Sequence, residues 1–220
     1  MQYNYNHIFL ENRQISNTSA IRWSCFTAMV IGIAWIFTLF HIISVPALAF
    51  QIIAPVSIFI LLLPAVVNHL MHLSDILLVG SKGINLLTGL ILGCNLTAVF
   101  LLSSTLSHYA SIIWLLPTLI ACQYYSKRIT SHIFWGGLAG MILSFYASIY
   151  LGSKDMNLSA LSIVSGDFTA ASIGKALVYL ISELLIYCAA YPLFMNITKR
   201  TELLMKKQKL SMLAYQAKQT

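Results

Sequence analysis

The residue whose type and position could most clearly do chemistry is Glu183, which lies within the apolar stretch KALVYLISELLIYCAAYPLF. A charged side chain at the centre of a bilayer costs roughly 3 kcal/mol or more, so an intramembrane carboxyl is a candidate for function. Glu183 would contact a ligand or act as a proton-linked switch. Alternatively, it would form a structural hydrogen bond to a neighbouring helix through Asn95, Tyr146 or a histidine. Lys175 lies eight residues earlier, about two helical turns along the same face. Glu183, Lys175, Asn95 and Tyr146 are therefore the candidate ligand-binding or switch residues.

Other kinds of catalytic chemistry have no motif in this sequence. There is no phosphate-binding loop, zinc-protease motif, nucleophile elbow or Cys/His nucleophile pair. His69 and His72 lie three residues apart near Asp75, a spacing that can bind a metal ion. Two histidines at a membrane boundary are more often ordinary polar residues, so we expect neither a metal nor a cofactor. The four cysteines lie in apolar stretches without a CxxC pair and are expected to be small buried side chains.

The composition points to a membrane protein. Of the 220 residues, 59% are hydrophobic and 9% are charged, whereas a soluble domain has about 25% charged residues. The net charge of +7 would suggest nucleic acid as the partner of a soluble protein. No basic stripe with interleaved aromatic residues lies outside the apolar stretches, however. The lipid bilayer is therefore the expected partner, and nucleic acid is not.

Six apolar stretches predict six helices, because each approaches the roughly 20 residues needed to cross a bilayer and none alternates as a barrel strand does. They cover residues 20–43, 45–70, 83–103, 109–125, 131–151 and 173–197. If the N-terminus is cytoplasmic, the cytoplasmic side holds eleven of the thirteen basic residues: Arg13, Arg22, Lys82, Lys127, Arg128, Lys199, Arg200, Lys206, Lys207, Lys209 and Lys218. The sequence therefore predicts an all-α polytopic membrane protein with both termini in the cytoplasm.

Three segments follow from this prediction: a cytoplasmic N-terminal segment (1–19), a six-helix transmembrane domain (20–197) and a C-terminal cytoplasmic helix (198–220). The last segment is rich in helix formers and has no proline or glycine. Leu203, Leu210 and Ala217 recur every seven residues, as do Met205 and Met212. The segment either projects as a signalling helix or lies on anionic lipid. We favour projection, with Leu203, Leu210, Met212 and Ala217 as the signal-transmitting residues.

Four stretches carry a family resemblance: LPAVVNHLMHLSD, INLLTGLILGCNL, HIFWGGLAGMILSFYASIYLG and LLIYCAAYPLFMNITKRTELLMKKQKLSMLAYQAKQT. The chain resembles the membrane-associated sensor (MASE-type) regions that precede GGDEF diguanylate cyclase domains in bacteria. The resemblance implies the bacterial inner membrane, a homodimer and cyclic di-GMP signalling. The GGDEF domain itself is absent, so no cyclase residue can be transferred to this chain.

Two functions are compatible with these observations. In the first, the chain is a sensory input module for a cytoplasmic output domain. In the second, it is a small-molecule transporter or the substrate-capture subunit of an importer, with Glu183 and the proline-containing helices lining a pocket under a lid formed by residues 152–170. A small hydrophobic ligand suits both. Deleting residues 198–220 would abolish signalling but not transport. An intramembrane enzyme is a weaker alternative, because it needs paired catalytic groups at one depth.

Overall fold

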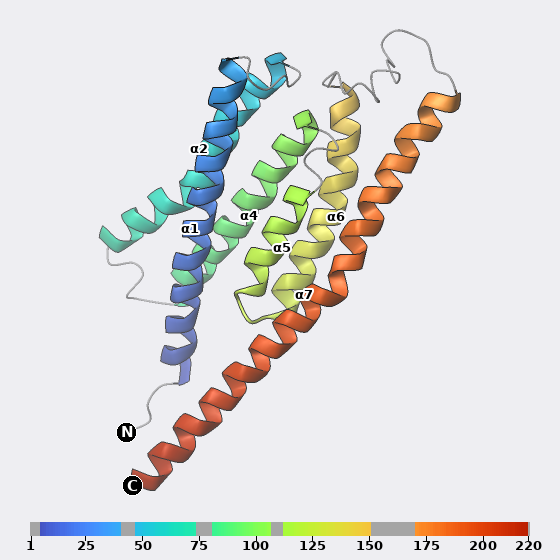
Figure 1. Cartoon of the computed structure of the whole chain (residues 1–220). Helices are drawn as coiled ribbons and strands as arrows, with labels where there is room; N and C mark the ends of the chain where they lie inside the picture. Colours follow the sequence, from blue (N-terminus) through green and yellow to red (C-terminus); the bar gives the residue numbers. More distant parts are fainter. Residues whose placement is uncertain (1–4, 41–46, 74–80, 107–111, 151–169, 220) are drawn as a thin grey trace.

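The computed structural model describes residues 5–40, 47–73, 81–106, 112–150 and 170–219, and this part of the chain is almost entirely helical, without strands (Figure 1). The helices run alternately up and down the bundle. Continuous apolar sequence favours helices because a helix satisfies its own backbone hydrogen bonds. Their bounds are α1 Tyr5–Leu39, α2 Ala47–Leu73, α4 Ser81–Leu106, α5 Leu115–Cys122, α6 Lys127–Tyr150 and α7 Ala170–Gln219.

Four of these helices, α1, α2, α4 and α7, are long and apolar enough to cross a membrane. The helix predicted over residues 109–125 is much shorter in the structure, because α5 has only eight residues. At 1.5 Å per residue, α5 is about 12 Å long, whereas the hydrocarbon core is about 30 Å thick. Just beyond α5, Tyr125 has a φ of 54°. This left-handed conformation often follows the last turn of a helix.

Helix α1 begins well before the apolar stretch that predicted it. The polar residues between Tyr5 and Ala20 are helical and continue into the membrane-length part without a break. Ser16 and Asn17 within this polar part are buried. Asn17 donates a hydrogen bond to the Ile84 carbonyl of α4, so the start of α1 is packed into the bundle.

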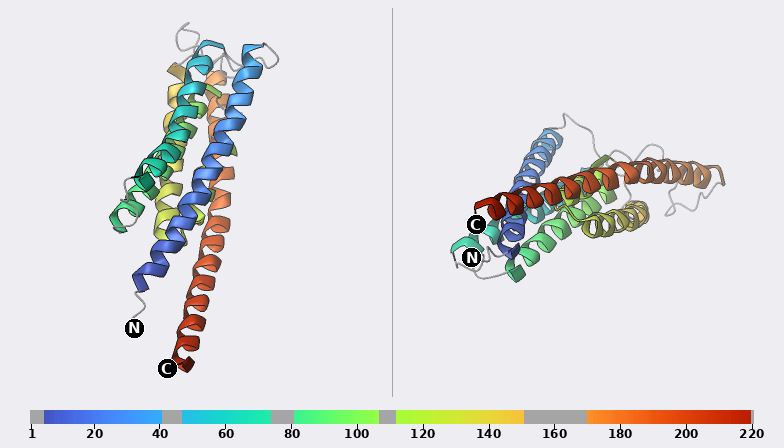
Figure 2. Two further views of the ribbon diagram at one scale, coloured as in Figure 1. Left: turned by 90° about the vertical axis from the view of Figure 1, so that its left-hand side faces the viewer. Right: turned by 90° about the horizontal axis from the view of Figure 1, so that it is seen from below.

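Helix α7 joins the last apolar stretch to the charged C-terminal segment as one helix of 50 residues. At 1.5 Å per residue, its length is about 75 Å. Pro192 lies inside α7 without ending it. Figures 1 and 2 show that α7 extends past the end of the other helices, on the same side of the bundle as the start of α1.

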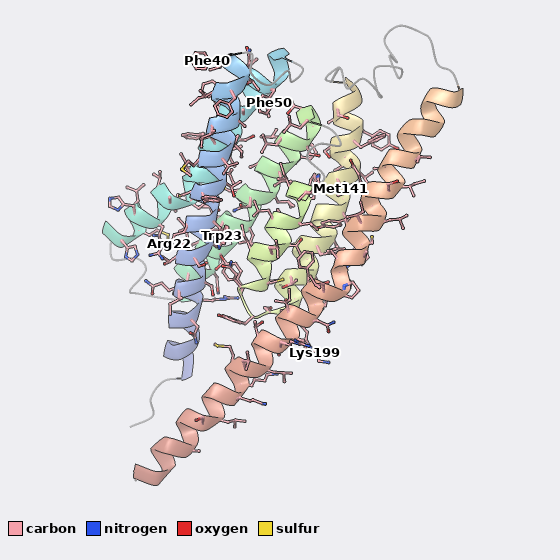
Figure 3. The ribbon with its side chains drawn as sticks, viewed as in Figure 1. Arg22, Trp23, Phe40, Phe50, Met141 and Lys199 are labelled. Atoms are coloured by element: carbon pink, nitrogen blue, oxygen red, sulfur yellow. The ribbon has the colours of Figure 1, made fainter. Side chains whose placement is uncertain are left out.

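Helix α4 lies at the centre of the bundle. It packs against α1 and α2 on one side and against α5 and α6 on the other, while α7 packs on α5 and α6. Large apolar side chains such as Phe26, Phe59 and Leu185 are exposed on the outer faces of α1, α2 and α7. These faces suit contact with lipid, as expected for a membrane protein (Figure 3).

Candidate functional site at the junction of α5, α6 and α7

The junction that attaches α7 to the bundle is centred on Tyr187, which is 1% exposed. Its hydroxyl donates to the Phe134 carbonyl of α6, with an oxygen–oxygen distance of 3.1 Å. The Thr118 hydroxyl of α5 lies 3.1 Å from the same oxygen. Because a phenol has one proton, Thr118 must be the donor to Tyr187. The Tyr187 ring stacks on Phe134 with centroids 4.6 Å apart. Three helices are thus joined at one side chain.

Two glycines of α6 make this close approach possible. A Cβ on Gly137 would overlap the Tyr187 hydroxyl and lie 3.1 Å from its Cζ. A Cβ on Gly140 would lie 2.7 Å from the Trp114 ring. Small residues allow membrane helices to pack closely. The GGxxG pattern therefore serves packing within the bundle, at Tyr187 of α7 and at Trp114 immediately before α5.

A second set of contacts holds α7 where it leaves the bundle. The Thr130 and Thr198 hydroxyls, both fully buried, are 3.2 Å apart. The Cys122 thiol donates a long hydrogen bond of 3.8 Å to the Phe194 carbonyl. One turn beyond Thr198, a Glu202 carboxylate oxygen is 4.0 Å from Lys127 Nζ. These contacts connect the end of α5 and the start of α6 to the last bundle-facing part of α7.

Trp114 connects this junction to the central helix. Its indole Nε1 donates to the Ser103 hydroxyl of α4 at 2.9 Å, and that hydroxyl lies 3.1 Å from the Ser144 hydroxyl of α6. Ser144 itself donates to the Met141 carbonyl. Ser103 is therefore the donor to Ser144. The hydrogen-bond chain ties α4 to α6, which holds α7.

Two further polar pairs join α1 to α4. The Thr88 hydroxyl donates to Asn17 Oδ1 at 3.0 Å, and Asn95 Nδ2 donates to the Ser24 hydroxyl at 2.8 Å. In both helices the paired residues are seven positions apart, which places them on one face. The sequence interpretation considered Asn95 but missed Asn17, Ser24 and Thr88. Their spacing is the signal that could have identified them: each of the two helices has a pair of polar residues seven positions apart.

The four predicted ligand or switch residues are not gathered into one site. Asn95 is fully buried, and its amide group bonds to Ser24 and to the Ile91 carbonyl. Glu183 is partly buried on α7, one turn before Tyr187, and has an interaction partner. Tyr146 is exposed on α6 and contacts Phe145 edge to face. Lys175 belongs to α7, but its side chain lies outside the described residues.

The predicted signal-transmitting residues lie in the part of α7 beyond the junction. Leu203 and Leu210 are exposed, and the side chains of Met212 and Ala217 lie outside the described part. Met205 is partly buried, whereas Leu203 is exposed. Helical residues two apart do not share a face. The two seven-residue repeats therefore follow different faces of α7.

The turn between α5 and α6 also contains a buried phenol. Tyr124 is 2% exposed, and burial raises its pKa well above the ordinary value while the nearby Arg13 charge lowers it by less. The phenol therefore stays protonated.

Among the described residues, no three His, Cys, Asp or Glu side chains gather to hold a metal ion. The predicted lid over residues 152–170 falls almost wholly outside the described part of the chain.

Comparison with protein-family models, with curated proteins and with solved structures found no match for this chain.

Proposed function

We propose that the chain is a membrane-embedded sensory input module that passes a signal to a cytoplasmic output domain. The observation that carries this proposal is the continuity of α7, in which the last apolar stretch and the charged segment form one helix from Ala170 to Gln219. Tilt or rotation of a rigid helix at one end displaces its other end. A movement at Tyr187 would therefore be delivered beyond the bundle.

The route of this signal follows from the packing. Helices α1 and α2 pack on α4, α4 packs on α5 and α6, and these two hold α7. A change around α1, α2 or α4 would reach α7 through the Trp114–Ser103–Ser144 chain and the Tyr187 contacts. The close glycine contacts make this route sensitive to small displacements, because packed helices switch between discrete arrangements.

We include six membrane crossings with both termini in the cytoplasm as part of the proposal. The alternating directions place the starts of α4 and α6, with Lys82, Lys127 and Arg128, at the same end of the bundle as the start of α1 (Figure 1). Lys199 lies in the lower, projecting half of α7 (Figure 3). Basic residues gather on the cytoplasmic side of membrane proteins. Helix α5 spans less than half of the hydrocarbon core, so the fourth crossing would also need the residues on either side of α5.

The output domain we propose is a diguanylate cyclase, which makes cyclic di-GMP, in the bacterial inner membrane. This part rests on the sequence resemblance to MASE-type regions. A cyclase needs two active sites to join two GTP molecules, so a homodimer belongs to the same proposal.

The test places a GGDEF cyclase domain after Thr220 and measures cyclic di-GMP in cells. Gly137→Ala, which disturbs the Tyr187 contact, should change output at equal protein level. Gly89→Ala is the matched control, because a Cβ there meets nothing within 4 Å. Output that is identical in wild type and both variants would contradict the proposal. Retention of small-molecule uptake after deletion of residues 198–220 would favour an importer subunit.

A further inference from the structure

Two buried polar groups, one on α1 and one on α2, have no hydrogen-bond partner among the described residues. The Ser57 hydroxyl of α2 is fully buried and unpaired, and the Trp35 indole Nε1 of α1 is buried and unpaired. Other buried hydroxyls, such as those of Ser24 and Thr198, donate to the carbonyl four residues earlier. An unpaired polar group is costly where neither water nor lipid supplies a partner.

One contact between α1 and α2 allows the levels of the two groups in the bundle to be compared. An ideal Cβ on Gly32 would lie 3.8 Å from the Ile58 side chain, so residue 32 of α1 is level with residues 57 and 58 of α2. Trp35 is three residues beyond Gly32 on the same face of α1. Long helical side chains lean toward the N-terminus by about one turn. We infer from this lean that the Trp35 indole extends toward the level of Ser57.

Both groups face one apolar cluster. Ala54 and Leu61, which share a helix face with Ser57, belong to the cluster that also contains Ala28 and Phe50, and Trp35 packs against it. A group that binds there would accept a hydrogen bond from the indole and exchange one with Ser57. A neutral hydroxyl does both, whereas a charged group is costly to bury among apolar side chains.

We propose that Trp35 and Ser57 form a binding site for a neutral hydroxyl group between α1 and α2. The hydroxyl comes either from a buried water molecule or from the head of a small alcohol whose chain lies in the apolar cluster. Asn95 Oδ1 is a third buried polar atom without a partner, and it lies lower in the bundle, level with Ser24. Pro55, two residues before Ser57, interrupts the backbone hydrogen bonds of α2. This interruption gives α2 a place to bend around a bound molecule.

The experiment is water-edited solid-state NMR on the full chain in phospholipid vesicles, with the tryptophan indoles labelled with ¹⁵N. The Trp35 signal is identified by its loss in Trp35→Phe. Trp114 is the internal control, because its indole is buried and its Nε1 already donates to Ser103. We expect magnetisation from water to reach the Trp35 Nε1 and not the Trp114 Nε1, and we expect Ser57→Ala to abolish the transfer to Trp35.

A second arm adds 1-decanol to the same vesicles. A shift of the Trp35 Nε1 signal that is absent in Ser57→Ala, together with loss of the water transfer, supports an alcohol as the source of the hydroxyl. Water transfer that decanol leaves unchanged supports buried water. The absence of both water transfer and a decanol-dependent shift overturns the proposal, as does a Ser57→Ala protein that melts at a higher temperature than the wild type. These readouts do not depend on a signalling output, so they test the site separately from the proposed function.

Discussion

The close contact between Gly137 and Tyr187 makes a quantitative prediction. In Gly137→Ala the new Cβ overlaps the Tyr187 hydroxyl, so the phenol must move and release its hydrogen bonds to Thr118 and the Phe134 carbonyl. Overpacking of a well-packed core costs about 1–3 kcal/mol. Loss of two hydrogen bonds at about 0.6 kcal/mol each adds about 1 kcal/mol. The higher helix propensity of alanine offsets up to about 1 kcal/mol of this loss of stability.

The expected net loss of unfolding free energy is therefore about 1–3 kcal/mol. The assay is reversible unfolding in detergent micelles, followed by tryptophan fluorescence. Gly89→Ala, which meets no neighbour within 4 Å, should be neutral or slightly stabilising. The double variant Gly137→Ala/Tyr187→Phe removes the hydroxyl and leaves only the contact with the ring carbon at 3.1 Å. In that background, Gly137→Ala should cost less than about 1 kcal/mol.

Two results would refute this reasoning. One is equal stability of Gly137→Ala and Gly89→Ala, which would mean that the α6–α7 contact is looser than described. The other is a cost of Gly137→Ala that is unchanged in the Tyr187→Phe background, because the clash would then lie elsewhere.

Three further predictions concern α7. Thr198→Val removes the buried hydroxyl contact with Thr130 and should lower the unfolding free energy by about 1 kcal/mol in the same unfolding assay. Glu202→Gln should change it by less than about 0.5 kcal/mol, because the pairs of Glu202 with Lys127 and Lys206 are at the surface; a larger loss that Lys127→Gln reproduces would show that the Lys127 pair anchors α7. Glu183→Gln should change the output of an attached cyclase while expression and membrane insertion stay normal, and unchanged output would make Glu183 a structural residue.

The helices whose apolar stretch is long enough to cross a membrane were well predicted from the sequence. The predicted 45–70 helix corresponds to α2, which begins at Ala47 and continues to Leu73, and the predicted 83–103 helix corresponds to α4, which extends beyond the prediction at both ends, from Ser81 to Leu106. The 109–125 prediction was too long, since hydropathy alone does not show where a helix ends, and Tyr125 departs from helical geometry. The length of α1 was underestimated because its first part is polar and therefore lies outside the apolar stretch. Asn17 in this polar part is buried against α4.

The site was harder to predict than the fold. Asn95 was chosen because a polar residue in an apolar helix needs a partner, and it has one in Ser24. Tyr187 was overlooked, since a tyrosine in a membrane helix usually marks an interface. Its importance arises from Thr118, Phe134 and Gly137, which are 50 or more positions away and meet it only in the folded chain.

The central claim is that α7 transmits movement as one rigid helix. The direct measurement inserts four or seven helix-forming residues between Lys206 and Lys207, with a cyclase domain following Thr220, and records cyclic di-GMP. Four inserted residues rotate the distal part of α7 by about 40° about the helix axis and lengthen the helix by about 6 Å. Seven inserted residues leave the distal part within about 20° of its original orientation. The account predicts altered output with four added residues and restored regulation with seven. Equal output from the wild type and both insertions would contradict it.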